Sequence, residues 1–193
     1  MSFKTFSSCG GEALYLFVLG WLLAQLEIQV EGAYGWAERL PTWRFESPWF
    51  LKITNGKPLT GYHFYLISFL FFLFHFPLLF VPFSPAVEAK IIASYWLMGD
   101  TWDFQWFVWN PAWGIRRFLT EKIAWFPIKL LGFPIEYYLG VCLSFLTLWI
   151  LDPGMLFRWV VVAIGLLFFN ALAVALSLAR PGKERGKNGF PQV

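Results

Sequence analysis

Long apolar stretches alternate with short polar ones along this chain, and several of the apolar stretches have the length of a membrane span. A hydrocarbon core of about 30 Å needs roughly 20 mostly apolar residues in one helix. Residues 61–83 fit best, because their only ionisable side chains are His63 and His75, while Pro77 and Pro82 predict a kink and then a stop. Further spans are predicted over residues 13–30, 135–151 and 155–178.

The segment 86–109 is long enough to span but carries Asp100 and Asp103 and is dense in tryptophan. Tryptophan prefers the headgroup region, which is typical of an interfacial helix or of the end of a span. Asn110-Pro111 ends the helix in either case. The pattern therefore predicts an all-α, polytopic helical membrane bundle with four or five spans.

The basic residues favour five spans, because short loops rich in Lys and Arg stay on the cytoplasmic side. With five spans and an outer N-terminus, 12 of the 15 basic residues lie inside and Lys4, Lys90 and Arg158 lie outside. Four spans reduce the division to 10 and 5. We therefore expect one transmembrane domain over residues 1–179, and a basic cytoplasmic tail over residues 180–193.

A surface-lying amphipathic helix is predicted for residues 115–126, at the inner face of the membrane. One side of this segment is polar, and the other side is expected to enter the lipid with Ile115, Phe118, Leu119, Ala124 and Trp125. On the polar side, Arg116 and Arg117 are candidates for binding a phosphate or lipid headgroup.

Composition supports a membrane protein and excludes an ordinary water-soluble domain. The chain is 58% hydrophobic, 22% aromatic and only 14% charged, with a mean hydropathy of +0.57. Cys9 and Cys142 lie in unlike settings and predict neither a zinc site nor a disulfide. We expect the first apolar segment to remain as a span rather than to be removed as a signal peptide. The lipid bilayer is the expected partner, and nucleic acid is not.

The candidate chemistry is a group of ionisable residues at one end of the bundle. Antiparallel pairing of residues 61–83 with 86–109 brings His63 within one helical turn of Asp103, with Asp100 a further turn away. The end of the first span adds Glu27 and Glu31, which share a helix face. Ionisable groups in the membrane zone are costly and usually functional. These five residues predict an oxygen-rich site for Mg²⁺, Mn²⁺ or iron.

A purely structural interpretation of the same residues stays open. Glu27 and Glu31 then end a span at the interface, and Asp100 and Asp103 are solvated beside the tryptophans. His63 then belongs to an interfacial aromatic belt. His75 is expected to be a neutral histidine bonded to a neighbouring helix.

Three functions fit these patterns. An accessory or structural subunit of a membrane complex, in contact with partner subunits or with its own copies, is slightly favoured because aromatics are many and strong motifs are few. A metal-dependent enzyme of the plasma membrane, acting on a lipid headgroup or small amphiphile, is almost level with it. A small transporter comes third, because paired Gly/Pro-interrupted spans are missing. The sequence holds no GxSxG, HExxH, phosphate loop or CxxCH motif.

Overall fold

The computed structural model describes residues 3–180, with side chains from Ser8 onward, and its regular structure is almost entirely helical. The predicted basic tail therefore falls, apart from Arg180, outside the described residues. The long helices are α1 (Phe3–Glu31), α3 (Gly61–His75), α4 (Pro85–Trp109), α6 (Ile135–Leu151) and α7 (Leu156–Ala179). The connecting elements are β1 (Arg44–Phe45), α2 (Pro48–Ile53), β2 (Leu59–Thr60), η1 (Phe76–Leu79), α5 (Gly114–Thr120), β3 (Lys129–Leu130), β4 (Phe133–Pro134) and η2 (Pro153–Met155).

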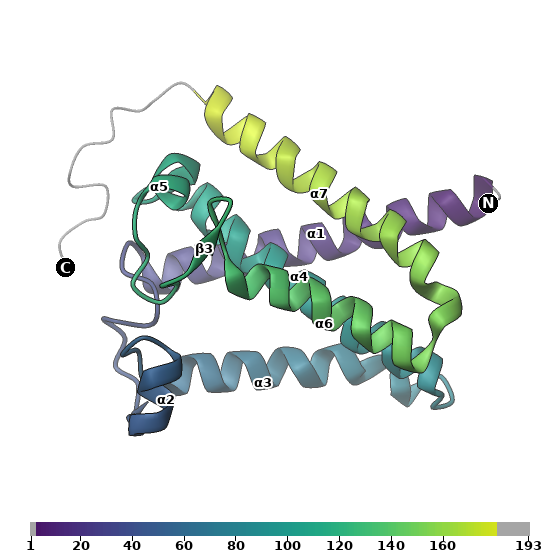
Figure 1. The fold of residues 1–193 in the computed structure, drawn as a ribbon, viewed down its shortest axis with the longest axis horizontal. Helices are drawn as coiled ribbons and strands as arrows, with labels where there is room; N and C mark the ends of the chain where they lie inside the picture. Colours follow the sequence, from purple (N-terminus) through teal and green to yellow (C-terminus); the bar gives the residue numbers. More distant parts are fainter. Residues whose placement is uncertain (1–2, 181–193) are drawn as a thin grey trace.

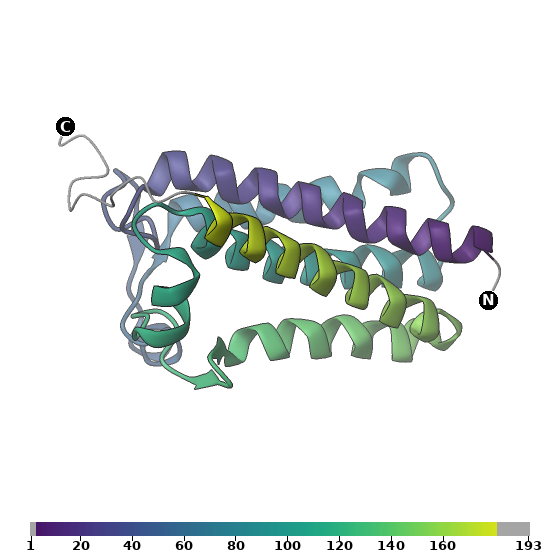
Figure 2. The ribbon, with the colours of Figure 1, turned by 90° about the horizontal axis from the view of Figure 1, so that it is seen from above.

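The long helices run up and down along roughly one direction (Figure 1, Figure 2). The connections 32–60 and 110–134 lie at one end of the bundle, together with the last turn of α7, and we call this the loop end. The start of α1 and the turns after α3 and α6 lie at the opposite, N-terminal end. The short connection through Asp152 and η2 joins α6 and α7 in a tight helical hairpin.

Helix α4 is the centre of the bundle and packs against the four other long helices. A central position suits two of its polar side chains, Asp103 and Gln105, because they find partners on neighbouring helices. Gln105 donates from Nε2 to Asn170 Oδ1 of α7 at 2.7 Å, and accepts a bond from Trp109 Nε1 at 2.6 Å. Gly20 of α1 lies against the backbone of α4, where an added Cβ would approach Trp102 N to 3.1 Å. Small residues allow such close helix packing.

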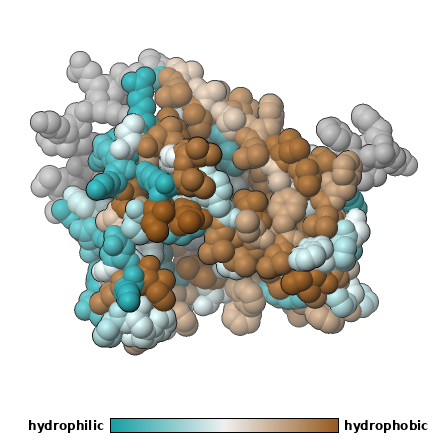
Figure 3. Space-filling view, in the orientation of Figure 1, coloured by the Kyte–Doolittle hydropathy of each residue, from teal (hydrophilic) through white to brown (hydrophobic). Residues whose placement is uncertain are grey.

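The molecule has the surface and the helix lengths of an integral membrane protein. Three helical stretches are long and apolar enough to cross a membrane, namely Ser8–Glu31, Gly61–Leu79 and Pro153–Ala179, and α6 is a shorter apolar helix. Figure 3 shows hydrophilic residues gathered over the loop end and hydrophobic ones over much of the remaining flank. These features confirm the predicted class of all-helical membrane protein.

Two predicted helices are shorter than their sequence patterns suggested. The α-helix that begins at Gly61 ends at His75 and continues as the 3₁₀ turn η1, because Pro77 lacks the N–H that an α-helix needs. The predicted amphipathic helix 115–126 ends at Thr120, and the following residues are irregular.

The apolar side of α5 is also covered differently from the prediction. Phe118 and Ile123 are 0% and 2% exposed, and they pack in a cluster with Trp106 and Phe107 of α4. Of the residues expected to enter lipid, Ile115 is buried as well, whereas Leu119 is 41% exposed. The apolar side of this segment is thus covered largely by protein and not by lipid, because the connection 110–134 folds back over the end of α4.

Candidate metal centre

Glu27 and Glu31 occupy the last two turns of α1, where the helix reaches the loop end. They are only 8% and 7% exposed, so both carboxylates are buried. The chain turns back immediately after Glu31, through left-handed backbone at Gly32, Gly35, Trp36 and Ala37. This turn brings the Ala37 N–H to Glu31 Oε1 at 2.5 Å, which fixes the direction of the carboxylate.

His63 lies in the first turn of α3, directly beside the end of α1. Thr60 caps this helix, since its Oγ1 accepts a bond from His63 N at 3.3 Å and lies 2.7 Å from His63 Nδ1. The other ring nitrogen, Nε2, lies 3.6 Å from Glu31 Oε1. The Trp36 ring covers the imidazole at a centroid distance of 5.0 Å. When Nδ1 carries the hydrogen and donates it to Thr60, Nε2 presents its lone pair to Glu31.

One ligand atom from each of Glu27, Glu31 and His63 lies within 4.8 Å of the others. Metal–ligand distances are about 2.0–2.6 Å, so ligand atoms on opposite sides of one ion are separated by about 4–5 Å. Two carboxylates and one imidazole suit Mn²⁺ or iron, and Mg²⁺ to a lesser degree. The bond from Ala37 N–H to Glu31 and the contact between Thr60 and His63 resemble the outer hydrogen bonds that orient metal ligands.

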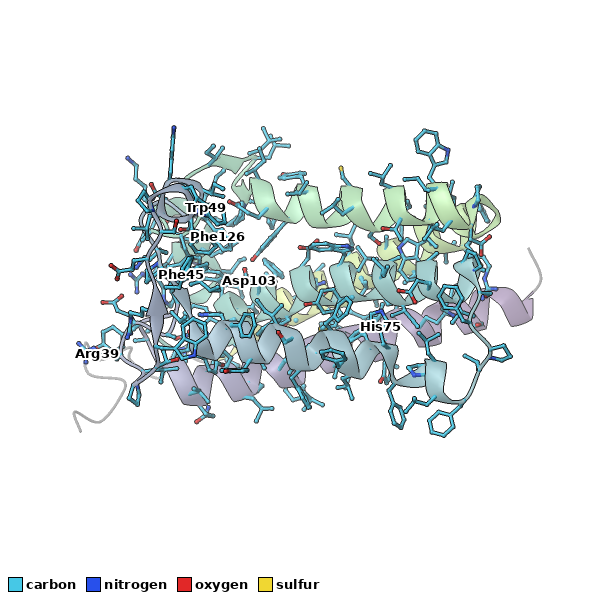
Figure 4. All side chains as sticks on the ribbon, turned by 90° about the horizontal axis from the view of Figure 1, so that it is seen from below. Arg39, Phe45, Trp49, His75, Asp103 and Phe126 are labelled. Atoms are coloured by element: carbon cyan, nitrogen blue, oxygen red, sulfur yellow. The ribbon has the colours of Figure 1, made fainter. Side chains whose placement is uncertain are left out.

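Asp100 and Asp103 point toward α6 and not into this three-residue group. The Tyr137 hydroxyl donates to Asp103 Oδ2. Asp100 lies against Gly140, where an added Cβ would overlap its carboxylate, and Asp100 Oδ2 is buried with no hydrogen-bond partner. Asp103 is close enough to Glu27 and Glu31 to repel their charge. Figure 4 shows Asp103 in the interior of the bundle, between the helices and away from the surface.

The structure thus brings together three of the five predicted ligands and places the two aspartates beside them. Sequence reasoning missed Glu136 and Tyr137, which α6 contributes from its first turn. Glu136 Oε2 is also buried with no hydrogen-bond partner. The available signal was their place at the start of the apolar segment 135–151, because the predicted five-span arrangement puts that start at the same end of the bundle as Glu31 and His63.

Basic side chains do not balance these carboxylates. Across the described side chains, neither a lysine nor an arginine forms an ion pair with Glu27, Glu31, Asp100 or Asp103. Buried carboxylates without a partner are costly while ionised. A cation or bound protons must therefore supply the compensation.

Arg116 and Arg117, the predicted phosphate-binding pair, differ in what they contact. Arg117 is held by Glu121, with Nε–Oε1 and Nη2–Oε2 distances of 2.8 Å each, and its guanidinium lies 4.8 Å from the centre of the Trp113 ring. This bidentate bond keeps the pKa of Glu121 below its ordinary value. Arg116 is exposed at the loop end. Of the two, Arg116 is therefore better placed to meet an outside anion.

Fold and site define a helical membrane protein with a buried carboxylate–histidine group at one end of its bundle. The sequence matches no family model, and neither a curated protein nor a solved structure is significantly similar to it.

Proposed function

We propose that this protein is a five-span, metal-dependent membrane enzyme that acts on a lipid headgroup or a small amphiphile. Glu27, Glu31 and His63 are the proposed metal ligands. Asp103 of α4, which accepts a bond from Tyr137 of α6, stands beside them.

The observation that carries this proposal is the meeting of three ligand atoms within 4.8 Å in a buried setting where, among the described side chains, no lysine or arginine pairs with the two carboxylates. Two buried carboxylates next to each other repel, and one divalent cation compensates both charges at once. A structural role at the end of a span does not require Glu27 and Glu31 to turn inward beside an imidazole. Glutamates that face water would serve that role without the free-energy cost of burying a carboxylate.

The arrangement of the helices supports five spans with the N-terminus outside. The connections at the loop end carry Arg39, Arg44, Lys52, Lys57, Arg116, Arg117, Lys122 and Lys129, and α7 ends there at Arg180. The N-terminal end carries Lys4, Lys90 and Arg158. The positive-inside rule then places the loop end, and with it the candidate metal centre, at the cytoplasmic face.

The location of the site supports an amphiphilic substrate. Figure 3 shows the apolar flank meeting the hydrophilic loop end, and such a boundary corresponds to the level of lipid headgroups. The proposed metal ligands lie in this end of the bundle. A bound divalent metal supplies Lewis acidity or an activated water there. Arg116 lies at the same end, where it can attract an anionic headgroup.

Metal content of the purified full-length protein tests this proposal. After equilibration with Mn²⁺ and removal of free ion, we expect about one Mn²⁺ per chain by elemental analysis, with a matching spectrum of bound Mn²⁺. Glu27→Gln and His63→Ala each remove a ligand and are expected to lower the affinity by at least about tenfold, the low end of the effect of disturbing even an outer partner of a metal ligand. Glu46→Gln is the matched control, because Glu46 is an exposed glutamate at the same end.

Asp103→Asn separates the three-residue site from a five-residue one. Asp103 is bonded to Tyr137 and stands outside the group of three, so its substitution is expected to weaken binding less than Glu27→Gln does. Equal Mn²⁺ binding by the unaltered protein, Glu27→Gln and Glu46→Gln would refute the proposed metal centre.

A second candidate function, an accessory subunit of a membrane complex, is favoured by the exposure of α3. Only Gly61 and Leu70 of this helix are buried, and Tyr65, Phe69 and Phe72 are 65%, 63% and 75% exposed. Such an aromatic face suits a partner helix. A photo-crosslinking residue at position 72 is expected to capture a membrane protein in cells, and adducts with lipid alone would contradict the subunit role.

A further inference from the structure

A lateral groove lies at the N-terminal end of the bundle, far from the candidate metal centre. Glu12 at the groove and Glu27 at the centre are 15 residues apart on α1. A helix rises about 1.5 Å per residue, so about 22 Å separates them. We infer that this groove binds one anionic membrane lipid, with an acyl chain along its apolar wall and the headgroup beside Lys90.

The groove has a volume of about 690 Å³ and lies between α1, the end of α3 with η1, and the first turns of α4. Tyr15 and Phe76 at its edge are 66% and 53% exposed, so it opens on the flank of the bundle. That flank belongs to helices long and apolar enough to span a membrane. The apolar wall that would receive a chain consists of Leu16, Leu19, Leu73, Phe74 and Ile91.

The polar end of the groove carries an excess of positive charge. Lys90 Nζ lies 2.7 Å from Glu12 Oε1, and Arg158 Nη2 from α7 lies 3.7 Å from the same oxygen. Two cations therefore share one carboxylate. Arg158 Nε is buried with no hydrogen-bond partner, so the guanidinium is incompletely satisfied.

The nearby carboxylate of Glu88 is directed away from the groove and toward His75. His75 Nε2 lies 3.1 Å from Glu88 Oε1, and His75 Nδ1 lies 2.7 Å from the Phe71 carbonyl oxygen. Neither His75 nor Glu88 lines the groove.

At the groove itself, Lys90 and Arg158 meet the single carboxylate of Glu12, and a lipid with one negative headgroup charge complements the second cation. Lys90 lines the groove and keeps 41% of its side chain exposed. Ser8 and Ser94 also line it and offer hydroxyl groups to a phosphate or glycerol. A free phosphate would use the charge but leave the apolar wall empty, whereas a lipid uses both.

Titration of the full-length protein in detergent, followed by native mass spectrometry, tests this inference. The probes are phosphatidylglycerol and phosphatidylcholine with identical acyl chains. We expect one tight site that prefers phosphatidylglycerol by about fivefold, the ratio expected for one basic group near an anionic lipid. Lys90→Ala is expected to abolish that preference, and Lys122→Ala, an exposed lysine at the loop end, is expected to keep it.

Two neighbouring glycines of α1 provide a matched pair for the acyl-chain wall. An added Cβ meets no atom within 4 Å at either Gly10 or Gly11, but only Gly11 lines the groove. Gly11→Leu is expected to weaken binding of both lipids by about fourfold per displaced methylene group, and Gly10→Leu is expected to leave it unchanged.

Three results would overturn the inference. They are equal affinities for the two lipids, equal effects of the two leucine substitutions, and complete competition by water-soluble glycerol phosphate at the lipid's own concentration. None of these measurements depends on metal, so the inference and the proposed metal centre can fail separately.

Discussion

Ser144 links three helices in the middle of the bundle, and its substitution is the sharpest test of the packing. Its hydroxyl donates to the Ala93 carbonyl of α4 at 3.0 Å and accepts a bond from Trp159 Nε1 of α7 at 2.7 Å. Ser144 and Trp159 are both 0% exposed. Ser144→Ala therefore leaves a buried indole N–H without a partner, and water cannot replace the lost bond.

The expected loss of unfolding free energy follows from that stranded donor. An unsatisfied buried donor costs about 1–3 kcal/mol, while hydrogen bonds between membrane helices average about 0.6 and reach about 1.7 kcal/mol. The Ala93 carbonyl keeps its helical bond and adds little. We expect Ser144→Ala to cost about 1–2 kcal/mol, near the upper end of the membrane values, because it strands the fully buried Trp159 N–H.

Reversible unfolding by increasing SDS in mixed micelles measures this loss. Ser177→Ala is the matched control, since the Ser177 hydroxyl donates only to Val174 of its own helix, and the change is expected to be near neutral. In a double-mutant cycle, Ser144→Ala should cost less once Trp159→Phe has removed the donor. A cost of Ser144→Ala equal to that of Ser177→Ala, or zero coupling with Trp159→Phe, would refute the three-helix link.

Three further predictions concern topology, packing and the metal centre. A cysteine introduced at Lys57 should react only with reagents that reach the cytoplasm, and labelling from outside would restore the four-span arrangement. Gly140→Ala places a methyl group on the Asp100 carboxylate and should cost about 1–3 kcal/mol in the same unfolding assay. An unchanged midpoint would contradict the close approach of α4 and α6. Mn²⁺ affinity should rise with pH, because carboxylates and imidazole bind metal after losing protons, and pH-independent binding would exclude these ligands.

The sequence was sufficient to predict the apolar helices, because hydropathy and length alone define them. Residues 155–178 correspond closely to α7, and residues 135–151 to α6. The segment 86–109 could not be assigned in this way. Asp103 and Gln105 lower the hydropathy summed over this segment and so argue against a membrane span. In the bundle, however, they bond to Tyr137 and Asn170. Such compensation depends on neighbouring helices, which a sum over one segment does not contain.

The same reason explains how much of the site was predictable. His63 could be assigned to the loop end from the sequence, because the short turn between α3 and α4 fixes the register of these two helices. Glu136 and Tyr137 follow a long connection, 110–134, so their register with α4 depends on tertiary packing alone. The prediction that the apolar side of residues 115–126 enters the lipid missed the burial of Phe118 for a related reason. An amphipathic pattern does not tell whether lipid or protein covers the apolar side.

The glutamates at the two ends of the bundle differ in their partners, and this difference bears on function. At the N-terminal end, the Glu12 carboxylate is contacted by two basic side chains, Lys90 and Arg158. At the loop end, Glu27 and Glu31 are buried and pair with no lysine or arginine of the described part of the chain, although such residues are abundant in the adjoining connections. A lysine or arginine was therefore available nearby, and the fold directs these side chains elsewhere. Buried carboxylates without a lysine or arginine partner remain open to a cation, and this difference between the two ends supports the proposed metal-dependent role over a purely structural one.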